Sequence, residues 1–309
     1  MRTLTGTAVL AVAAVGLTAC GNLSFGTHHE DRSYTAPGGV TKLKLQAGGG
    51  RVEVTASDSP GIRVSERLRW SHHKNKPRVK HVTEGDTLNL SSKCATQVIG
   101  FSACGVTYRV QVPRSTPVEI SARDGSINAS GLAGTVKLHS DNGSITATNL
   151  RASTASLSSR DGSVRVSGRA AIADLRSDNG SVDATELTAD KLTARSRDGR
   201  IRLSGTATVA DLDTANGSIE ASRLTADRIT ARTKDGSILL RLAAPPARVD
   251  AGTANGSVEL FLPAGVGYAI TTSTNNGSKQ IDSGIHEDSR SERKIKLDTN
   301  DGDIRVAPN

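Results

Sequence analysis

The sequence is poor in aromatic side chains, and this shortage limits the core that the chain can build. Its 309 residues include three Phe, three Tyr and one Trp, whereas 31 residues are Gly. A thick globular core normally depends on the large area that aromatic rings bury. We therefore expect an elongated fold with a thin core of Ala, Val, Ile and Leu.

Long hydrophobic runs are also absent, apart from one at the N-terminus. Residues 1–19 carry one positive charge, at Arg2, and an apolar stretch that ends at Leu17, the layout of a cleaved export signal. The tetrapeptide ending at Cys20 resembles the lipobox of bacterial lipoproteins, in which the signal is cut before Cys20 and the sulfur receives a diacylglycerol. Two acyl chains give a firm anchor, so this resemblance implies an extracytoplasmic protein, lipid-anchored to the cell membrane. The alternative is an ordinary cleaved signal with an incidental cysteine.

Cysteine is scarce as well, and only Cys94 and Cys104 remain once Cys20 is set aside. An even pair in an exported protein predicts a disulfide. In the chain-entropy model such a bridge stabilises the fold by roughly 3 kcal/mol. The pair lacks the CxxC spacing of redox centres and the further ligands of a metal site, so we expect neither a metal nor a cofactor.

Positive charge is in excess, with a net charge of +8 and a pI near 9.6. In an exported protein this balance favours anionic wall polymers or lipid headgroups over nucleic acid. The densest basic segment is residues 63–81, and a cationic patch there would attract such polymers in a salt-sensitive way. The alternative is a solvated hairpin with charged outward positions. The candidate contacts are Arg63, Arg67, Arg69, Lys74, Lys76, Arg78 and Lys80.

Patterns along the chain predict four parts. Residues 1–19 form the signal, and residues 20–38 are polar without periodicity, as in a flexible tether. Residues 39–120 alternate apolar and polar side chains in short runs, which predicts an N-terminal β region with the disulfide loop. A repeat fills residues 121–309, and no segment after the signal shows a helical stripe.

An Asp-Gly or Asn-Gly unit recurs through this repeat at spacings of 18 to 20 residues. Strand residues follow each unit, and two short strands cannot bury an apolar face unless they stack on copies of themselves. We therefore predict a parallel β-solenoid, a single-stranded β-helix with coils of 18–19 residues, started or capped by the preceding strands. We expect each glycine to need a positive φ at its turn. The glycines stand at 125, 143, 162, 180, 199, 217, 236 and 256, then more loosely at 277 and 302.

Stacking of the coils aligns equivalent side chains into rows, which we call ladders. Two ladders should face inward together, because side chains two residues apart on a strand face the same way. The first begins Ile127, Ile145, Val164 and Val182, and the second begins Ala129, Ala147, Val166 and Ala184. Before the glycines, Asp and Asn alternate, which separates the carboxylates and lets each Asp accept from an Asn amide. The residue two positions before each glycine alternates between basic and acidic over Arg123, Asp141, Arg160, Asp178 and Arg197. A shift of the strand register by one coil would bring like charges together and would cost free energy.

A polysaccharide hydrolase or lyase is the sharpest catalytic alternative. Asp124, Asp161, Asp198 and Asp235 would stand about 9.6 Å apart, just beyond the roughly 6.5 to 9.5 Å used by inverting glycosidases. An active site is normally one place, however, and this arrangement recurs in alternate coils, so a structural role explains it better. The intervening Asn residues also leave too little clustered negative charge for calcium.

From about residue 40 to the C-terminus, four motifs carry a family resemblance: residues 50–54 (GRVEV), 110–113 (VQVP), 124–127 (DGSI) and 301–306 (DGDIRV). With them, the sequence resembles the bacterial putative-adhesin family, a domain of unknown function common in lipoproteins. The resemblance implies a solenoid fold and supplies no catalytic residues. We therefore expect a non-enzymatic, surface-anchored solenoid that presents a binding or structural face to envelope polymers or an extracellular partner. The alternatives are an envelope-associated regulatory or scaffold protein that binds another membrane protein, and a polysaccharide-active enzyme.

Overall fold

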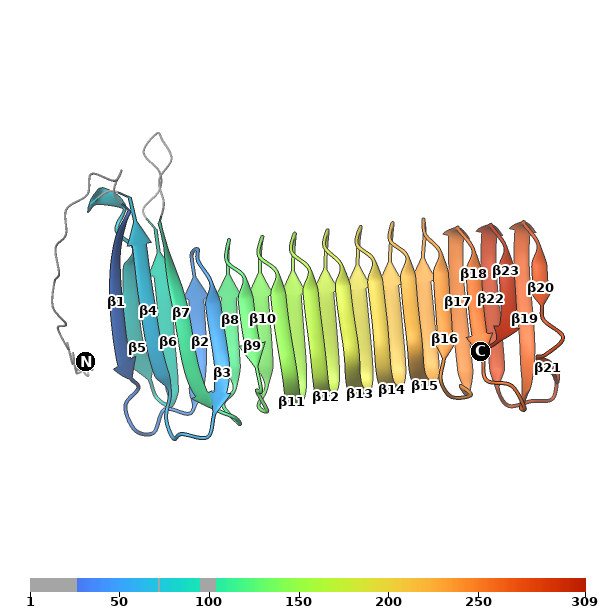
Figure 1. The fold of residues 1–309 in the computed structure, drawn as a ribbon, viewed down its shortest axis with the longest axis horizontal. Coiled ribbons are helices and arrows are strands. Elements are labelled where there is room, and N and C mark those ends of the chain that lie inside the picture. Colours follow the sequence, from blue (N-terminus) through green and yellow to red (C-terminus); the bar gives the residue numbers. More distant parts are fainter. Residues whose placement is uncertain (1–26, 72, 95–103) are drawn as a thin grey trace, which may run out of the picture.

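The computed structural model describes residues 27–71, 73–94 and 104–309, and these form a long stack of β-strands (Figure 1). The predicted all-β solenoid is confirmed, and the described residues contain one short 3-10 turn, η1 (His73–Asn75). The predicted signal, Cys20 and His72 lie outside the described residues. Within the described part, no helix is long and apolar enough to cross a membrane.

The central coils are single long strands that run from one sheet into the opposite one. The first part of β11 pairs in parallel with β9, and its last part pairs with β10. Each later coil stacks on the one before, with Ile145 opposite Val164 and Val164 opposite Val182. The predicted register and the coils of 18–19 residues are thereby confirmed. The strands are β8 (Val118–Ala122), β9 (Ile127–Ser130), β10 (Val136–Ser140), β11 (Ile145–Ser159), β12 (Val164–Ser177), β13 (Val182–Ser196), β14 (Ile201–Thr214) and β15 (Ile219–Thr233).

The alternation of 19 and 18 residues arises at the corner between the two sheets. Ala147 pairs with Val166 and Leu150 pairs with Gly168, so two residues lie between the paired positions in the first coil and one residue lies between them in the next. The first coil is therefore one residue longer at this corner. In the longer coils the corner contains a residue in the left-handed backbone conformation, with φ of 53° at Asn149 and 51° at Glu186. In the shorter coils Gly168 turns it with φ of 110°, a conformation that glycine adopts without steric cost.

The N-terminal cap combines parallel and antiparallel strands. β2 and β3 form the first coil, because they pair in parallel with β8 and β9. β6 and β7 stack in parallel on the outer side of that coil, and β5, β4 and β1 follow as antiparallel strands. The strands are β1 (His28–Thr35), β2 (Lys42–Ala47), β3 (Val52–Ser57), β4 (Arg63–Trp70), β5 (Arg78–Glu84), β6 (Thr87–Lys93) and β7 (Cys104–Pro113).

One boundary of the predicted tether is wrong, because residues 28–35 form strand β1. This strand pairs along its whole length with β4, from His28 opposite Trp70 to Thr35 opposite Arg63. Its sequence lacks apolar alternation because it is an edge strand, in which most side chains are exposed and Tyr34 packs against the core. Backbone pairing with β4 therefore defines the strand.

The C-terminal coils stack in an order that differs from their order in the chain. β22 lies between β17 and β19, and β23 lies between β18 and β20. The outermost coil is consequently β19 with β20, as Figure 1 shows at the right-hand end. The strands are β16 (Ile238–Leu242), β17 (Arg248–Asn255), β18 (Val258–Leu262), β19 (Gly267–Asn276), β20 (Lys279–Ile281), β21 (His286–Glu287), β22 (Lys294–Asp301) and β23 (Ile304–Pro308).

The core is a thin double ladder of aliphatic side chains, as predicted. Ile127, Ile145 and Val164 are fully buried, and Ala129 and Ala147 are almost fully buried two residues further on. The expected reason for the repeated glycines is wrong, however. In that series only Gly256 and Gly302 have φ in the left-handed region among the described residues. At the other positions a Cβ would collide with the neighbouring coil's backbone, as at Gly162, where it would lie closer than 3.0 Å to the Gly143 carbonyl oxygen.

A buried row of hydroxyl groups holds these close backbone turns together. The Ser177 hydroxyl donates to the Gly162 carbonyl at 2.9 Å and accepts from its own coil's Gly180 N–H at 2.9 Å. The sequence contains a signal for this row, because a Ser or Thr stands three residues before each repeat glycine from Gly143 onward. No role was assigned to these hydroxyl groups in the sequence analysis. The other hydroxyls that donate to a repeat-glycine carbonyl of an adjacent coil belong to Ser140, Ser159, Ser196, Thr214, Thr233, Thr253, Thr274 and Thr299.

Candidate functional site

The predicted basic residues divide between different faces of the N-terminal cap. On β4 the outward side chains are Arg63, Ser65, Arg67 and Arg69, and we refer to these four as the β4 face. β5 belongs to the opposite sheet through its pairing with β6. Val79 on β5 packs against the core, so the alternation of side chains along a strand directs Arg78 and Lys80 outward. The seven candidates therefore do not form one patch.

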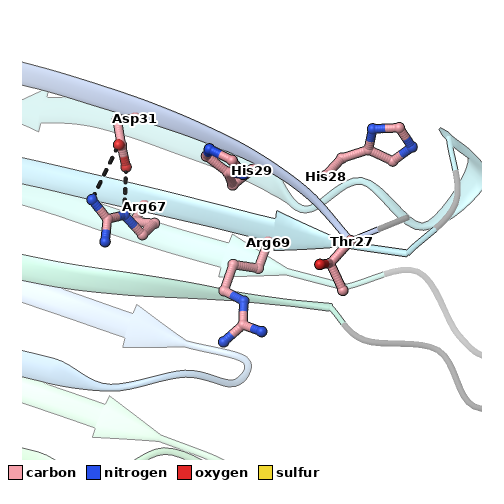
Figure 2. Close-up of a pocket in the computed structure, with 6 residues that line it drawn as sticks. All are labelled: Thr27, His28, His29, Asp31, Arg67 and Arg69. Atoms are coloured by element: carbon pink, nitrogen blue, oxygen red, sulfur yellow. Dashed lines mark hydrogen bonds and ion pairs between the residues drawn. The ribbon is translucent and has the colours of Figure 1, made fainter. Parts of the chain in front are cut away.

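The β4 face contains one neutralised arginine between two others. Arg67 donates two hydrogen bonds to Asp31 of β1, at 2.8 and 3.2 Å (Figure 2). The Arg67 guanidinium holds the pKa of the Asp31 carboxyl below its usual range through these bonds. Neither Arg63 nor Arg69 forms an ion pair with any residue that the structure describes. They can therefore neutralise a bound anion without first breaking an ion pair.

A shallow hollow of about 390 Å³ opens beside this face. Figure 2 shows its lining, in which the Arg69 side chain stands apart from the Asp31–Arg67 pair. The lining residues are Thr27, His28, His29, Asp31, Arg67 and Arg69. Four of these side chains carry nitrogen donors and one is a carboxylate, so the hollow suits an anion better than a cation. Across the described residues, no group of three or more His, Cys, Asp or Glu side chains is placed to hold a metal ion.

Lysines of the basic segment have different surroundings. Lys76 pairs with Glu30 at 2.6 Å, and its ammonium lies 4.9 Å from the centroid of the Trp70 ring. Its hydrogen bond contributes, after that of Arg32, to holding the pKa of Glu30 below the ordinary value. Lys74 is exposed on η1 and makes no ion pair in the described part of the chain. Lys76 is thus part of the cap structure, whereas Lys74 is available to a partner.

An acid–base pair of a buried glutamate and a partly exposed histidine in the cap escaped the sequence analysis. The Glu66 side chain is fully buried, and its Oε1 lies 2.7 Å from Nε2 of His81 on β5. The Tyr34 ring stacks on His81 with 4.4 Å between centroids. Burial raises the pKa of the Tyr34 hydroxyl well above its ordinary value, and the nearby Glu66 charge adds to this effect. A sequence signal existed, since Glu66 occupies the inward phase of β4 between Val64 and Leu68.

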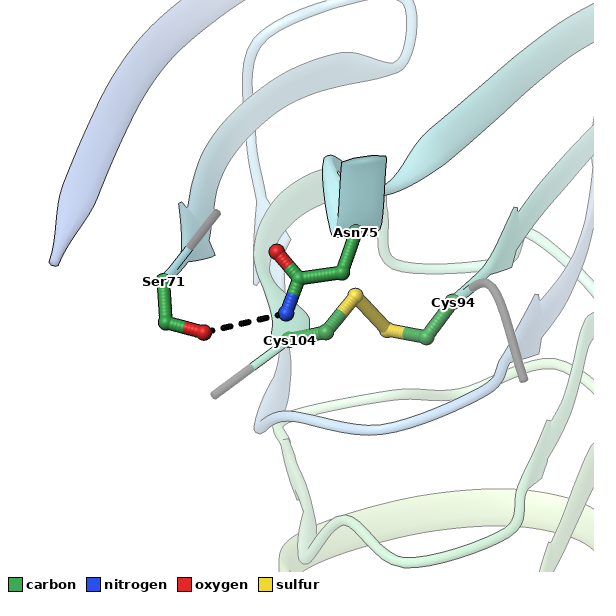
Figure 3. Close-up of a disulfide and its surroundings, with 4 residues drawn as sticks. All are labelled: Ser71, Asn75, Cys94 and Cys104. Carbon is green, nitrogen blue, oxygen red and sulfur yellow. Dashed lines mark hydrogen bonds between the residues drawn. A yellow bond between two sulfur atoms is a disulfide. The ribbon is translucent and has the colours of Figure 1, made fainter. Parts of the chain in front are cut away.

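The predicted disulfide between Cys94 and Cys104 is confirmed. Its sulfur atoms are 2.04 Å apart, and it joins the end of β6 to the start of β7 (Figure 3). Because β6 and β7 stack on β2 and β3 respectively, the bridge connects the two sheets at one edge of the cap. Nearby, the Asn75 side chain donates to the Ser71 hydroxyl at 3.0 Å. The covalent link and this hydrogen bond both lie close to the basic segment.

The repeated aspartates are turn residues whose carboxylates are bonded to the next coil. Asn142 donates to Asp124 at 2.5 Å, and Asn179 donates to Asp161 in the same way. The sign-alternating position supplies the intervening links, with Arg160 bonded to Asp141 at 3.0 Å. In the predicted sign-alternating row, Arg197 also pairs with Asp178, at 3.8 Å. Asp198 and Asp235 accept likewise from Asn216 and Asn255.

Comparison with protein families identifies the fold. The model of the Toastrack DUF4097 family matches residues 40–223 and again residues 173–307. The chain belongs to the Toastrack family. This assignment agrees with the resemblance found in the sequence motifs, and it covers the cap from β2 onward as well as the coils. No curated protein matches the chain.

Comparison with solved structures finds similar proteins at low sequence identity. A putative adhesin from Parabacteroides merdae ATCC 43184 has 13% identity and a TM-score of 0.52, with 91% of this chain and 96% of that chain covered. A putative adhesin from Parabacteroides distasonis ATCC 8503 has 12% identity and a TM-score of 0.46, with 91% and 97% covered. One from Bacteroides fragilis NCTC 9343 has 17% identity and a TM-score of 0.38, also with 91% and 97% covered. At 13% identity the likeness to the Parabacteroides merdae structure concerns the fold alone.

Proposed function

We propose that this Toastrack protein is a non-enzymatic, lipid-anchored surface protein whose N-terminal cap binds an anionic polymer of the cell envelope. The observation that carries the proposal is the pair of cations on the β4 face, Arg63 and Arg69, which have no ion-pair partner among the described residues. A hollow lined by donor side chains lies beside Arg69. The described chain starts at this end of the solenoid, so an anchor at Cys20 would hold the cap near the envelope (Figure 1).

The arrangement of the aspartates supports the non-enzymatic part of the proposal. Each member of the series Asp124, Asp161, Asp198 and Asp235 is bonded to an Asn of the next coil. The same turn recurs along the stack, which suits a scaffold better than a single reacting centre. The proposal therefore assigns binding to the cap and mechanical support to the coils.

Retention on polymer beads tests this proposal. The full chain, purified in detergent, is passed over immobilised anionic wall polymer at about 0.15 M salt, where surface charges are screened beyond roughly 8 Å. Arg63→Gln with Arg69→Gln should weaken the retention clearly, and higher salt should weaken the retention of the unaltered protein. The matched control is Arg78→Gln with Lys80→Gln, which removes two cations from the opposite sheet. Equal losses in both variants, or no retention of the unaltered protein, would refute the role of the β4 face.

A separate experiment tests the anchor. Cys20→Ser should release the protein from the membrane fraction into the medium, because the thiol that carries the diacylglycerol is lost. The control is Cys94→Ser with Cys104→Ser, which should leave the protein in the membrane fraction. Continued membrane association of the Cys20 variant would contradict lipid anchoring.

A further inference from the structure

Three cations stack directly on one another near the C-terminal end of the solenoid. Arg228 of β15 lies opposite Arg248 of β17, and Arg248 lies opposite Lys294 of β22. The strand spacing places neighbours in this row about 4.8 Å apart along the solenoid axis. All three side chains are exposed. We refer to Arg228, Arg248 and Lys294 as the C-terminal basic row.

Another charged row of the same solenoid alternates in sign. Along one sheet Arg202 lies between Asp183 and Glu220 and pairs with them at 3.2 and 3.8 Å. Like charges directly opposite one another destabilise a sheet, so such alternation is the favourable arrangement. In the C-terminal basic row, no member forms an ion pair with any residue that the structure describes. The C-terminal basic row thus contains a like-charge repulsion that the Asp183–Arg202–Glu220 row avoids.

The row also borders a hollow on the surface. This hollow has a volume of about 480 Å³ and is lined by Arg228, Ala247, Arg248, Glu292 and Lys294. Its lining includes one carboxylate, that of Glu292, against three cations. Asp227 precedes Arg228 in the chain, and neither acid forms an ion pair with a member of the row. The positive field at the hollow is therefore not cancelled by its immediate neighbours.

We propose that the C-terminal basic row is an anion-binding site for a linear polyanion that lies across the strands, along the solenoid axis. Guanidinium groups bind oxyanions such as phosphate in a bidentate geometry, which suits Arg228 and Arg248. Cations aligned at the strand spacing match successive charged groups of one chain better than a single small anion. Binding would also relieve the repulsion within the row.

This site is separate from the β4 face. Eight strand spacings separate β4 from β15, which is about 40 Å along the stack. The proposal therefore does not rest on the function assigned to the N-terminal cap. Loss of the Arg63 and Arg69 cations should leave binding at the C-terminal basic row intact.

Polyphosphate of defined length is the probe for this site. The full chain in detergent is titrated at about 0.15 M salt with linear polyphosphate, with orthophosphate, and with phosphatidylglycerol vesicles as separate arms. Arg228→Gln with Arg248→Gln should weaken polyphosphate binding by about tenfold or more, since each lost charge contact contributes substantially to a polyanion complex. The matched control is Arg151→Gln with Arg169→Gln, an exposed pair of adjacent arginines on β11 and β12. It should change the affinity less than twofold.

The thermal midpoint provides a second readout. Polyphosphate should raise the midpoint of the unaltered protein and of the Arg151/Arg169 variant by the same amount, and it should raise that of the Arg228/Arg248 variant clearly less. The variant itself should be at least as stable as the unaltered protein, because it removes a like-charge contact. Equal losses of affinity in the two double variants would refute the site, and so would preferential binding of orthophosphate or of vesicles.

Discussion

The middle coils and the N-terminal cap differ in how their polar and charged side chains are bonded. In the coils, buried hydroxyls bridge glycine turns and the Asp and Asn side chains bond from coil to coil. The cap instead buries Glu66 beside His81, uses a disulfide, and leaves Arg63 and Arg69 without ion pairs in the described structure. The comparison indicates that repeated features of this protein maintain the stack, whereas binding residues are to be sought where the repeat ends.

The largest effect should follow from adding one methyl group inside the coils. Gly162→Ala places a Cβ against the Gly143 backbone, closer than 3.0 Å, and neither backbone can move without separating the coils. We expect a loss of about 3 kcal/mol or more in the free energy of unfolding. Gly38→Ala is the control, since nothing lies within 4 Å of its added Cβ. Urea unfolding measures both, and a loss below about 1 kcal/mol for the Gly162 variant would contradict the close-packing explanation.

Removal of the disulfide should weaken the cap more than the coils. Cys94→Ser with Cys104→Ser releases a loop with a sequence separation of 10 residues. The expected loss is about 3 kcal/mol in the chain-entropy model. Hydrogen exchange should increase in β4 to β7 and remain slow in β12 to β14. Uniformly faster exchange in both regions would show that the cap and the coils unfold as one unit.

Alkaline pH should also distinguish the cap. Burial raises the pKa of Tyr34 and of Tyr108, so these hydroxyls stay neutral in the fold while they ionise in the unfolded chain above about pH 10. Their contribution is complete below about pH 10 and is lost as pH rises, with a slope that approaches about 1.4 kcal/mol per tyrosine and pH unit above the unfolded pKa. Tyr34→Phe with Tyr108→Phe should flatten the decline of stability between pH 10 and 11, measured by urea unfolding. An unchanged slope would mean that other groups cause the decline.

Loss of one buried hydroxyl should have an intermediate effect within the coils. Ser177→Ala leaves the Gly162 carbonyl and the Gly180 N–H without this partner, and we expect a loss of about 1 to 3 kcal/mol. Ser177→Thr should restore most of the stability, because Thr233 makes the same contact with the Gly217 carbonyl. Failure of the Thr variant to restore stability would indicate that side-chain volume, and not the hydroxyl, decides the effect.

The smallest effect should come from the exposed Asn and Asp row. Asn179→Asp places a carboxylate next to Asp161 and removes the amide that donates to it. Exposed like charges on adjacent strands cost about 0.2 to 1 kcal/mol, and high salt should reduce this cost. Asp161→Asn is the matched change, since it leaves two amides and no repulsion. A salt-independent loss in the Asn179 variant would argue against a role for charge.

The basic segment shows how far residue spacing can locate a site. Spacing places Arg63, Arg67 and Arg69 on one face of a strand, and the structure agrees. Spacing could not show that Asp31 neutralises Arg67, because Asp31 lies 36 residues away on a strand without apolar alternation. It also could not place Arg78 and Lys80 on the opposite sheet, which follows from the hairpin of β5 with β6.

Local sequence by itself determined the coil length, the register and the inward ladders, because period-two alternation and a recurrent turn leave one way to bury the aliphatic side chains. Only the tertiary structure decided the stacking order at the ends. Parallel strand edges offer similar backbone hydrogen bonds to any incoming strand. Backbone pairing alone therefore does not dictate that β22 lies between β17 and β19, or that β2 lies between β6 and β8. The role of the repeat glycines was decided there too, since it depends on how closely the next coil approaches.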